Sequence, residues 1–114
     1  MDEKKIKKIK LTASDGKEYM LAFDRASCKR LSNIGFTLED IDEKAVIRIP
    51  QLVAGAFLKF HSDMSRAEID KVWEEVKGKE ALLLELAKMY QEPIDSLLEE
   101  PKDDEKNATW EVVG

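Results

Sequence analysis

The chain has 114 residues, of which 43% are hydrophobic and 38% charged, and its formal net charge at pH 7 is -5. This length supports one small domain with a single modest core. The net negative charge argues against nucleic acid as the main partner, because phosphate binding depends on clustered lysine and arginine.

Charge is distributed unevenly along the chain. Lysines crowd the first ten residues, whereas acidic residues crowd the segment 92–105. The two ends can therefore attract each other, within one chain or between neighbouring copies. Cys28 is the only cysteine, which excludes an intrachain disulfide and a cysteine-based metal cluster.

The N-terminus carries charges from Asp2 onward and lacks the apolar core of a signal peptide. The longest apolar stretch, LVAGAFLKF at 52–60, is far shorter than the roughly 20 residues that span a bilayer. We therefore expect a cytoplasmic protein with no membrane partner.

Residues 4–24 predict a β-hairpin. In its second arm, Tyr19, Leu21 and Phe23 alternate with other residues, and the segment ASDG at 13–16 supplies a turn in which Gly16 can take a positive φ. Two strands alone are marginally stable in water, so the apolar face of the hairpin must pack against helices or be joined by another strand.

Two helices are predicted next. Asp24 is expected to cap a helix that runs to about Ile34 and stops at Gly35. Pro50 is expected to open a second helix, in which apolar residues point in nearly every direction and Gly55 leaves a notch. This second helix is either covered on all sides or keeps one face for a partner.

Two further helices follow. Ser65 and Glu68 form a capping box that opens a helix ending at Gly78. Its apolar stripe comprises Ile69, Val72, Trp73 and Val76. A last helix from Glu80 is expected to break at Pro93 and to restart for one or two turns. Its apolar side comprises Leu83, Leu86, Ala87, Tyr90, Ile94, Leu97 and Leu98.

These elements predict an α+β fold, in which an N-terminal β-hairpin precedes a small bundle of about four helices. We assign residues 1–100 to one domain and 101–114 to a flexible acidic tail with an apolar tip. Residues 101–107 offer too little apolar surface to offset the entropy of ordering. The tip, TWEVV at 109–113, predicts either a late strand on an edge of the hairpin or a docking element for a partner.

No motif for catalysis stands out. His61 lies next to Ser62 and close to Asp63, but three neighbours at a helix end point in different directions, which favours a structural role over a catalytic triad. Cys28 lies on the apolar stripe of the first predicted helix, which favours a buried thiol. Glycine-rich phosphate loops and metal-ligand spacings are absent from the sequence. We expect no cofactor, no metal, no small-molecule substrate and no enzymatic activity.

Four segments in order characterise the chain: LAFDRASCKRLSNIGF at 21–36, IDEKAVIRIPQLVAGAFLKFHSDMSRAEIDKVWEEV at 41–76, LLLELAKMYQEPIDSLLEE at 82–100 and NATW at 107–110. With its apolar and acidic patterns around AGAF and YQEP, this order resembles the small tail assembly chaperones of long-tailed phages and prophages of Gram-positive bacteria. The resemblance covers nearly the whole chain.

The resemblance implies a non-enzymatic protein of the host bacterial cytoplasm. Such chaperones bind the tape measure protein, keep its largely helical, apolar chain from aggregating and help to recruit tail tube subunits. The candidate partner-binding residues are Leu52, Phe57, Phe60, Trp110, Val112 and Val113. Self-association remains open. The alternative is a cytosolic oligomerising adaptor or regulatory protein of a mobile element that has no chaperone activity.

Overall fold

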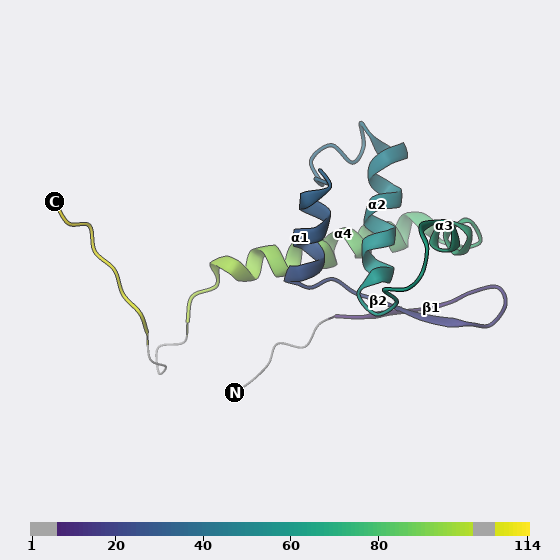
Figure 1. Ribbon diagram of the computed structural model, residues 1–114, viewed down its shortest axis with the longest axis horizontal. Coiled ribbons are helices and arrows are strands. Elements are labelled where there is room, and N and C mark those ends of the chain that lie inside the picture. Colours follow the sequence, from purple (N-terminus) through teal and green to yellow (C-terminus); the bar gives the residue numbers. More distant parts are fainter. Residues whose placement is uncertain (1–6, 102–106) are drawn as a thin grey trace.

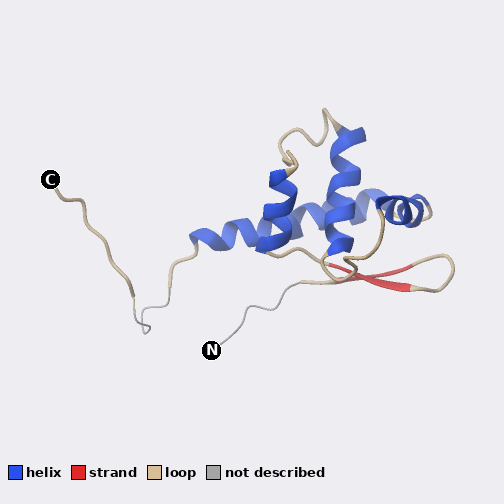
Figure 2. Cartoon of the chain, viewed as in Figure 1, coloured by secondary structure: helices blue, strands red, loops and turns tan. Residues whose placement is uncertain are grey.

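The computed structural model of the chain describes residues 7–101 and 107–114. Its elements are strands β1 (Ile9–Thr12) and β2 (Glu18–Leu21), helices α1 (Arg25–Asn33), α2 (Ala45–Leu58), α3 (Arg66–Glu74) and α4 (Lys79–Asp95), and the short 3₁₀ helix η1 (Ser96–Leu98) (Figures 1 and 2). The predicted α+β fold, a hairpin followed by four helices, is confirmed. Within the described ranges, none of the helices is long and apolar enough to cross a bilayer.

The hairpin is antiparallel, with Leu11 opposite Tyr19, and Gly16 takes a φ of 89° in its turn. The backbone N–H of Met20 points away from β1 and donates to His61 Nε2 at 3.1 Å. Two residues on, the N–H of Ala22 donates to the carbonyl of Ala56 in α2 at 3.1 Å. The end of α2 therefore covers the outer edge of β2.

Helix α1 begins and ends where the sequence predicts. Asp24 accepts hydrogen bonds from the backbone N–H and the hydroxyl of Ser27, at 2.8 and 2.9 Å. Gly35 follows the helix with a φ of 90°. Gly55 leaves the expected notch, and Leu31 of α1 fills it: a Cβ at position 55 would lie 2.8 Å from Leu31 Cδ1.

Helix α2 is central, since it packs against α1, α3, α4 and β2 (Figure 1). It does not begin at Pro50, as predicted, but five residues earlier, at Ala45. Proline deprives the carbonyl of Val46 of its helical N–H donor. Val46 lies in the first turn and is 88% exposed, so water can satisfy that carbonyl.

The last two helices complete the core. Both hydrogen bonds of the predicted capping box between Ser65 and Glu68 are present. Helix α4 continues through Pro93 to Asp95, so the predicted break at this proline is wrong. Proline in the last turn removes a single hydrogen bond, and the helix ends soon afterwards. Leu97 and Leu98 are exposed rather than on the packed side of the helix.

The C-terminal residues 107–114 have no helix or strand and are exposed. The tip therefore does not form the predicted extra strand on the hairpin of its own chain. Most of the segment predicted to be a flexible acidic tail, residues 102–106, lies outside the described residues.

Candidate functional site

The six predicted partner-binding residues divide into a buried and an exposed group. Leu52 and Phe57 are both 0% exposed and lie in the core beneath the elements that surround α2. The prediction that these two residues contact a partner is therefore wrong, because a partner cannot reach them while the domain is folded. The exposed group comprises Phe60, Trp110, Val112 and Val113.

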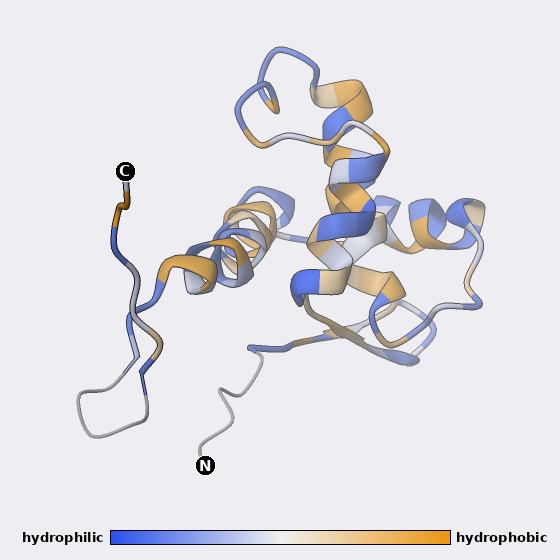
Figure 3. Cartoon of the chain, turned by 60° about the vertical axis from the view of Figure 1, so that its left-hand side comes forward, coloured by the Kyte–Doolittle hydropathy of each residue, from blue (hydrophilic) through white to orange (hydrophobic). Residues whose placement is uncertain are grey.

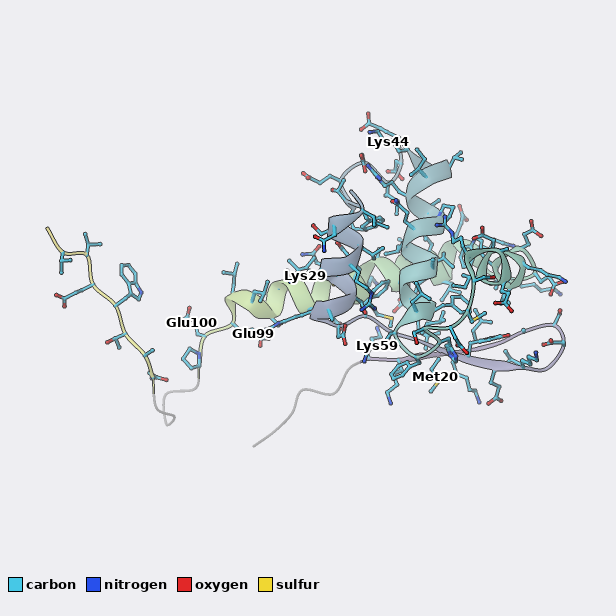
Figure 4. All side chains as sticks on the ribbon, viewed as in Figure 1. Met20, Lys29, Lys44, Lys59, Glu99 and Glu100 are labelled. Atoms are coloured by element: carbon cyan, nitrogen blue, oxygen red, sulfur yellow. The ribbon has the colours of Figure 1, made fainter. Side chains whose placement is uncertain are left out.

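Phe60 lies just beyond the end of α2 and is 45% exposed. The ammonium groups of Lys59 and Lys8 lie 5.1 and 5.8 Å from the centre of its ring. Met20 of the hairpin and Lys59 lie on the same side of the molecule (Figure 4). Cations over the ring face are favourable, so this surface mixes apolar and basic groups and is less suited to a purely apolar partner.

A better candidate is an apolar groove between α1 and α2, closed at one end by the start of α3. We call it the helix groove. It has a volume of about 300 Å³. Its walls and floor are Ser27 and Leu31 of α1, Ile34 just after that helix, Gln51, Ala54, Gly55 and Leu58 of α2, and Met64 and Ile69 from the α3 side.

One exposed apolar side chain lines the helix groove, and a second lies outside the lining, one helical turn before Gln51. Ile34 is 60% exposed, and Ile47, four residues before Gln51 on the same stripe of α2, is 54% exposed. From Ile47 to Leu58, this stripe extends about 16 Å, or three helical turns. Apolar residues alternate with polar ones along the helices that border it (Figure 3). An apolar strip of this length is suited to the apolar face of another helix.

Arginine side chains flank the helix groove. Arg30 and Arg66 contribute to its lining, and Arg66 forms an ion pair with Asp70 at 3.3 Å. Cations beside an apolar strip can pair with acidic residues on the polar face of a bound helix. The surroundings of the groove are therefore basic, although the chain as a whole is acidic.

An ion pair holds the loop that joins α1 to α2. Arg48 of α2 donates to both carboxylate oxygens of Asp40, at 2.9 and 3.2 Å, and also to Gln51 in the groove wall at 3.1 Å. The hydrogen bond from Arg48 is the main cause that lowers the pKa of Asp40. The pair fixes the first turn of α2, which carries Ile47.

A second ion pair joins α1 to the end of α2. Lys59 Nζ lies 3.2 Å from the carboxylate of Asp24, the cap of α1. Burial acts to raise the pKa of Asp24, but the hydrogen bonds from Ser27 and the nearby Lys59 outweigh it and lower that pKa. Asp24 is therefore held as a carboxylate, and it fixes the relative position of the two walls of the helix groove.

The two residues with reactive side chains have structural environments. The Cys28 thiol donates to the carbonyl of Tyr90 at 3.3 Å, and burial, with the nearby charge of Asp24, raises the pKa of Cys28 to about 11. His61 accepts the Met20 N–H and packs edge-on against Tyr19. A thiol with a raised pKa is a poor nucleophile at neutral pH. No group of acidic, cysteine or histidine residues in the described part could hold a metal ion.

The helix groove was missed from sequence, although one signal pointed to it. Ile34 lies at the predicted end of the first helix, and Val46 and Ile47 lie between the first and second predicted helices. Apolar residues at a helix end and in an unassigned connection are candidates for exposed surface. Their proximity depends on how α1 and α2 pack, which local spacing does not show.

Comparison with known proteins places the chain in a family without identifying a function. No curated protein and no solved structure matches it. One family model matches residues 4–113, which is nearly the entire chain. The chain belongs to the family described as domain of unknown function DUF5055.

Proposed function

We propose that this protein is a non-enzymatic tail assembly chaperone of a phage or prophage, which binds the tape measure protein in the host cytoplasm and helps to recruit tail tube subunits. The main observation in support is the helix groove, whose lining includes Ile34, which is 60% exposed. Ile47, which is 54% exposed, lies one helical turn before Gln51 of the groove wall. The resemblance in sequence supplies the class of client, and the groove supplies a binding mode.

The dimensions of the helix groove support helical clients. A strip of about 16 Å accommodates apolar residues spaced three and four apart over about three turns of a bound helix. A long helical protein with an exposed apolar face aggregates until that face is covered. Many copies, each covering a short part of the client, would keep it soluble and could leave one by one during assembly.

The charges beside the helix groove favour one type of client helix. Arg30 and Arg66 would attract helices whose polar face carries glutamate or aspartate next to the apolar stripe. The Arg66–Asp70 pair has exposed side chains and is weak in water, so Arg66 can exchange its partner at little cost. Binding should therefore weaken as the salt concentration rises.

The experiment is co-expression with a candidate tape measure protein, with the soluble yield of that client as the readout. Ile34→Glu places a carboxylate at the mouth of the helix groove, whereas the matched control Leu84→Glu changes a residue that is 65% exposed on α4, outside the groove. We expect Ile34→Glu to lower the soluble yield to that of the client alone and Leu84→Glu to leave it unchanged. Equal yields with both variants would contradict groove binding.

The same experiment separates the chaperone from the alternative adaptor of a mobile element. An adaptor would self-associate without raising the solubility of any helical client. If the wild-type protein leaves the client as insoluble as it is alone, the chaperone proposal fails, whatever the two variants do.

A further inference from the structure

Strand β1 has a free edge. In an antiparallel hairpin, opposite residues alternate between hydrogen-bonded and non-hydrogen-bonded pairs. Lys10 and Met20 are opposite residues, but the N–H of Met20 donates to His61, so they form a non-hydrogen-bonded pair. By alternation, the backbone N–H and C=O of Lys8, Lys10 and Thr12 point outward from β1. The sheet has two strands, and no described segment pairs with this edge.

A groove runs along this free edge, between β1 and the α3–α4 connection. We call it the edge groove. It has a volume of about 560 Å³ and is lined by residues 9–14 and, on the helix side, by the apolar Val72, Val76 and Leu82 and the charged Glu75 and Lys77. Contacts close both ends: Lys7 pairs with Glu85 at 3.0 Å at one end, and the Ser14 hydroxyl bonds to Glu75 at the other.

These limits suit one short strand. The edge groove follows residues 9–13, which extend over about 16 Å at the usual rise of a β-strand. Its floor is apolar, because Val72, Val76 and Leu82 are partly buried residues packed against the core. A strand added here would complete the outward hydrogen bonds of β1 and cover that floor.

The C-terminal tip has the matching pattern. Residues 109–113 number five, and Trp110, Val112 and Val113 are exposed by 85, 86 and 78%. In a strand, Trp110 and Val112 share one face, and Glu111 and Val113 lie on the other. With the apolar pair on the floor of the edge groove, Glu111 comes to lie on the solvent face beside Lys10, where opposite charges on neighbouring strands are favourable.

The tip leaves the domain far from the edge groove. Leu82 of the groove is in the first turn of α4, whereas the chain leaves for the tip after η1, beyond the other end of α4 (Figure 1). Helix α4 alone, with 17 residues, extends about 25 Å. To dock on its own domain, the segment 99–107 would have to run back along α4, whereas a tip from another copy has no such constraint.

The charges of the two segments are complementary. The segment before the tip is rich in acidic residues, and lysines flank the free edge at positions 7, 8 and 10. We propose that the tip of one copy binds as a third strand in the edge groove of a second copy. Since each copy offers one tip and one edge, copies join head to tail or exchange tips in a reciprocal dimer. This surface is separate from the helix groove and does not depend on the proposed client.

Two variants and their mixture test the proposal, with molar mass measured by light scattering over a concentration series. The double variant Trp110→Ala/Val112→Ala removes the apolar side chains of the tip. Lys10→Pro removes a hydrogen-bond donor from the free edge of β1, and it removes no hydrogen bond to β2, because the N–H of Lys10 points outward. Lys10→Ala is the matched control that retains this N–H. Circular dichroism checks the fold of each variant.

We expect the mass of the wild type to rise above 13.0 kDa with concentration. Each blocking variant should self-associate at least ten-fold more weakly, whereas Lys10→Ala should lose less. An equimolar mixture of the two blocking variants should form dimers, because one supplies an edge and the other a tip. If Lys10→Pro disturbs the hairpin, competition by a synthetic peptide of residues 108–114 takes its place and should dissociate the wild-type assembly.

Three results would overturn the proposal: a wild type that stays at 13.0 kDa at every concentration, a folded mixture that stays monomeric, or an assembly that the peptide leaves intact. If the tip binds the edge groove to the same extent at every protein concentration, it binds its own domain, and the proposed contact with a second copy is wrong.

Discussion

The centre of α2 and the C-terminal tip are both short apolar runs in a highly charged chain, yet their environments are opposite. Leu52 and Phe57 are 0% exposed beneath three helices and a strand, whereas Trp110 is 85% exposed. Side chains at helical spacing meet neighbouring elements on several sides, while the tip is exposed and forms no helix or strand. Covering elements, more than apolar composition, decide whether a run becomes core or contact surface.

At the end of α2, the chain changes from buried to exposed within three residues. Phe57 is fully buried and contacts Tyr19, with ring centres 5.5 Å apart. Phe60, three residues later, is nearly half exposed between two lysines. The neighbouring aromatic residues thus offer a matched pair of substitutions.

Phe57→Ala should have the largest effect on stability, a loss of about 3–5 kcal/mol, because it leaves a cavity that α2 and its neighbours cannot fill. Phe60→Ala should cost less than about 1 kcal/mol, as expected for a partly exposed side chain. Urea unfolding of both variants measures the difference. Equal losses would show that the covered and exposed ends of α2 are not distinct.

Asp24→Ala should have an intermediate effect, a loss of about 1 kcal/mol at pH 7, because it removes the cap of the helix that covers one side of α2. Asp24→Asn should retain most of the cap, since asparagine is also a good N-cap, and should lose only the contribution of the charge.

The pH dependence follows from the lowered pKa of Asp24. A carboxyl group whose pKa is lower in the folded state stabilises the protein at pH values above its pKa in the unfolded state, which is 3.8 here. This contribution is lost as the pH falls through the pKa of the folded state. The difference in stability between the wild type and Asp24→Asn should therefore shrink in melts below about pH 3.8. A difference that grows on acidification would refute the role of the charge.

Deletion of residues 108–114 should have the smallest effect, a change in stability within about 0.5 kcal/mol, because these residues are exposed and form no helix or strand. The same deletion should weaken self-association or client binding. Thermal melts and light scattering on one sample test both halves. Unfolding of the truncated domain would show that the tip is part of the core.

Much of the fold could be predicted from local chemistry. The hairpin, the cap at Asp24, the stop at Gly35 and the capping box at Ser65 each depend on residues close together in the sequence. The start of α2 could not, because Pro50 indicates a helix start locally, while the Asp40–Arg48 ion pair and packing hold the preceding turn in helical form.

The candidate site was harder to predict than the fold. An apolar stretch such as 52–60 shows that much surface needs covering, but not which side chains remain outside. Leu52, Phe57 and Phe60 were all predicted to bind a partner, but only Phe60 is exposed. The helix groove depends on the close approach of Leu31 to Gly55, a contact between two helices that no local pattern contains.

The most direct test of the central claim is an NMR titration of the ¹⁵N-labelled protein with an unlabelled amphipathic helical segment of a candidate tape measure protein. Helix-groove binding predicts the largest amide shifts at Ile34, Ala54, Leu58 and Met64 and none along β1. The Ile34→Glu variant should lose these shifts, and Leu84→Glu should retain them. Shifts confined to the hairpin or the tip, or no shifts at saturating peptide, would contradict the helix groove as the client-binding surface.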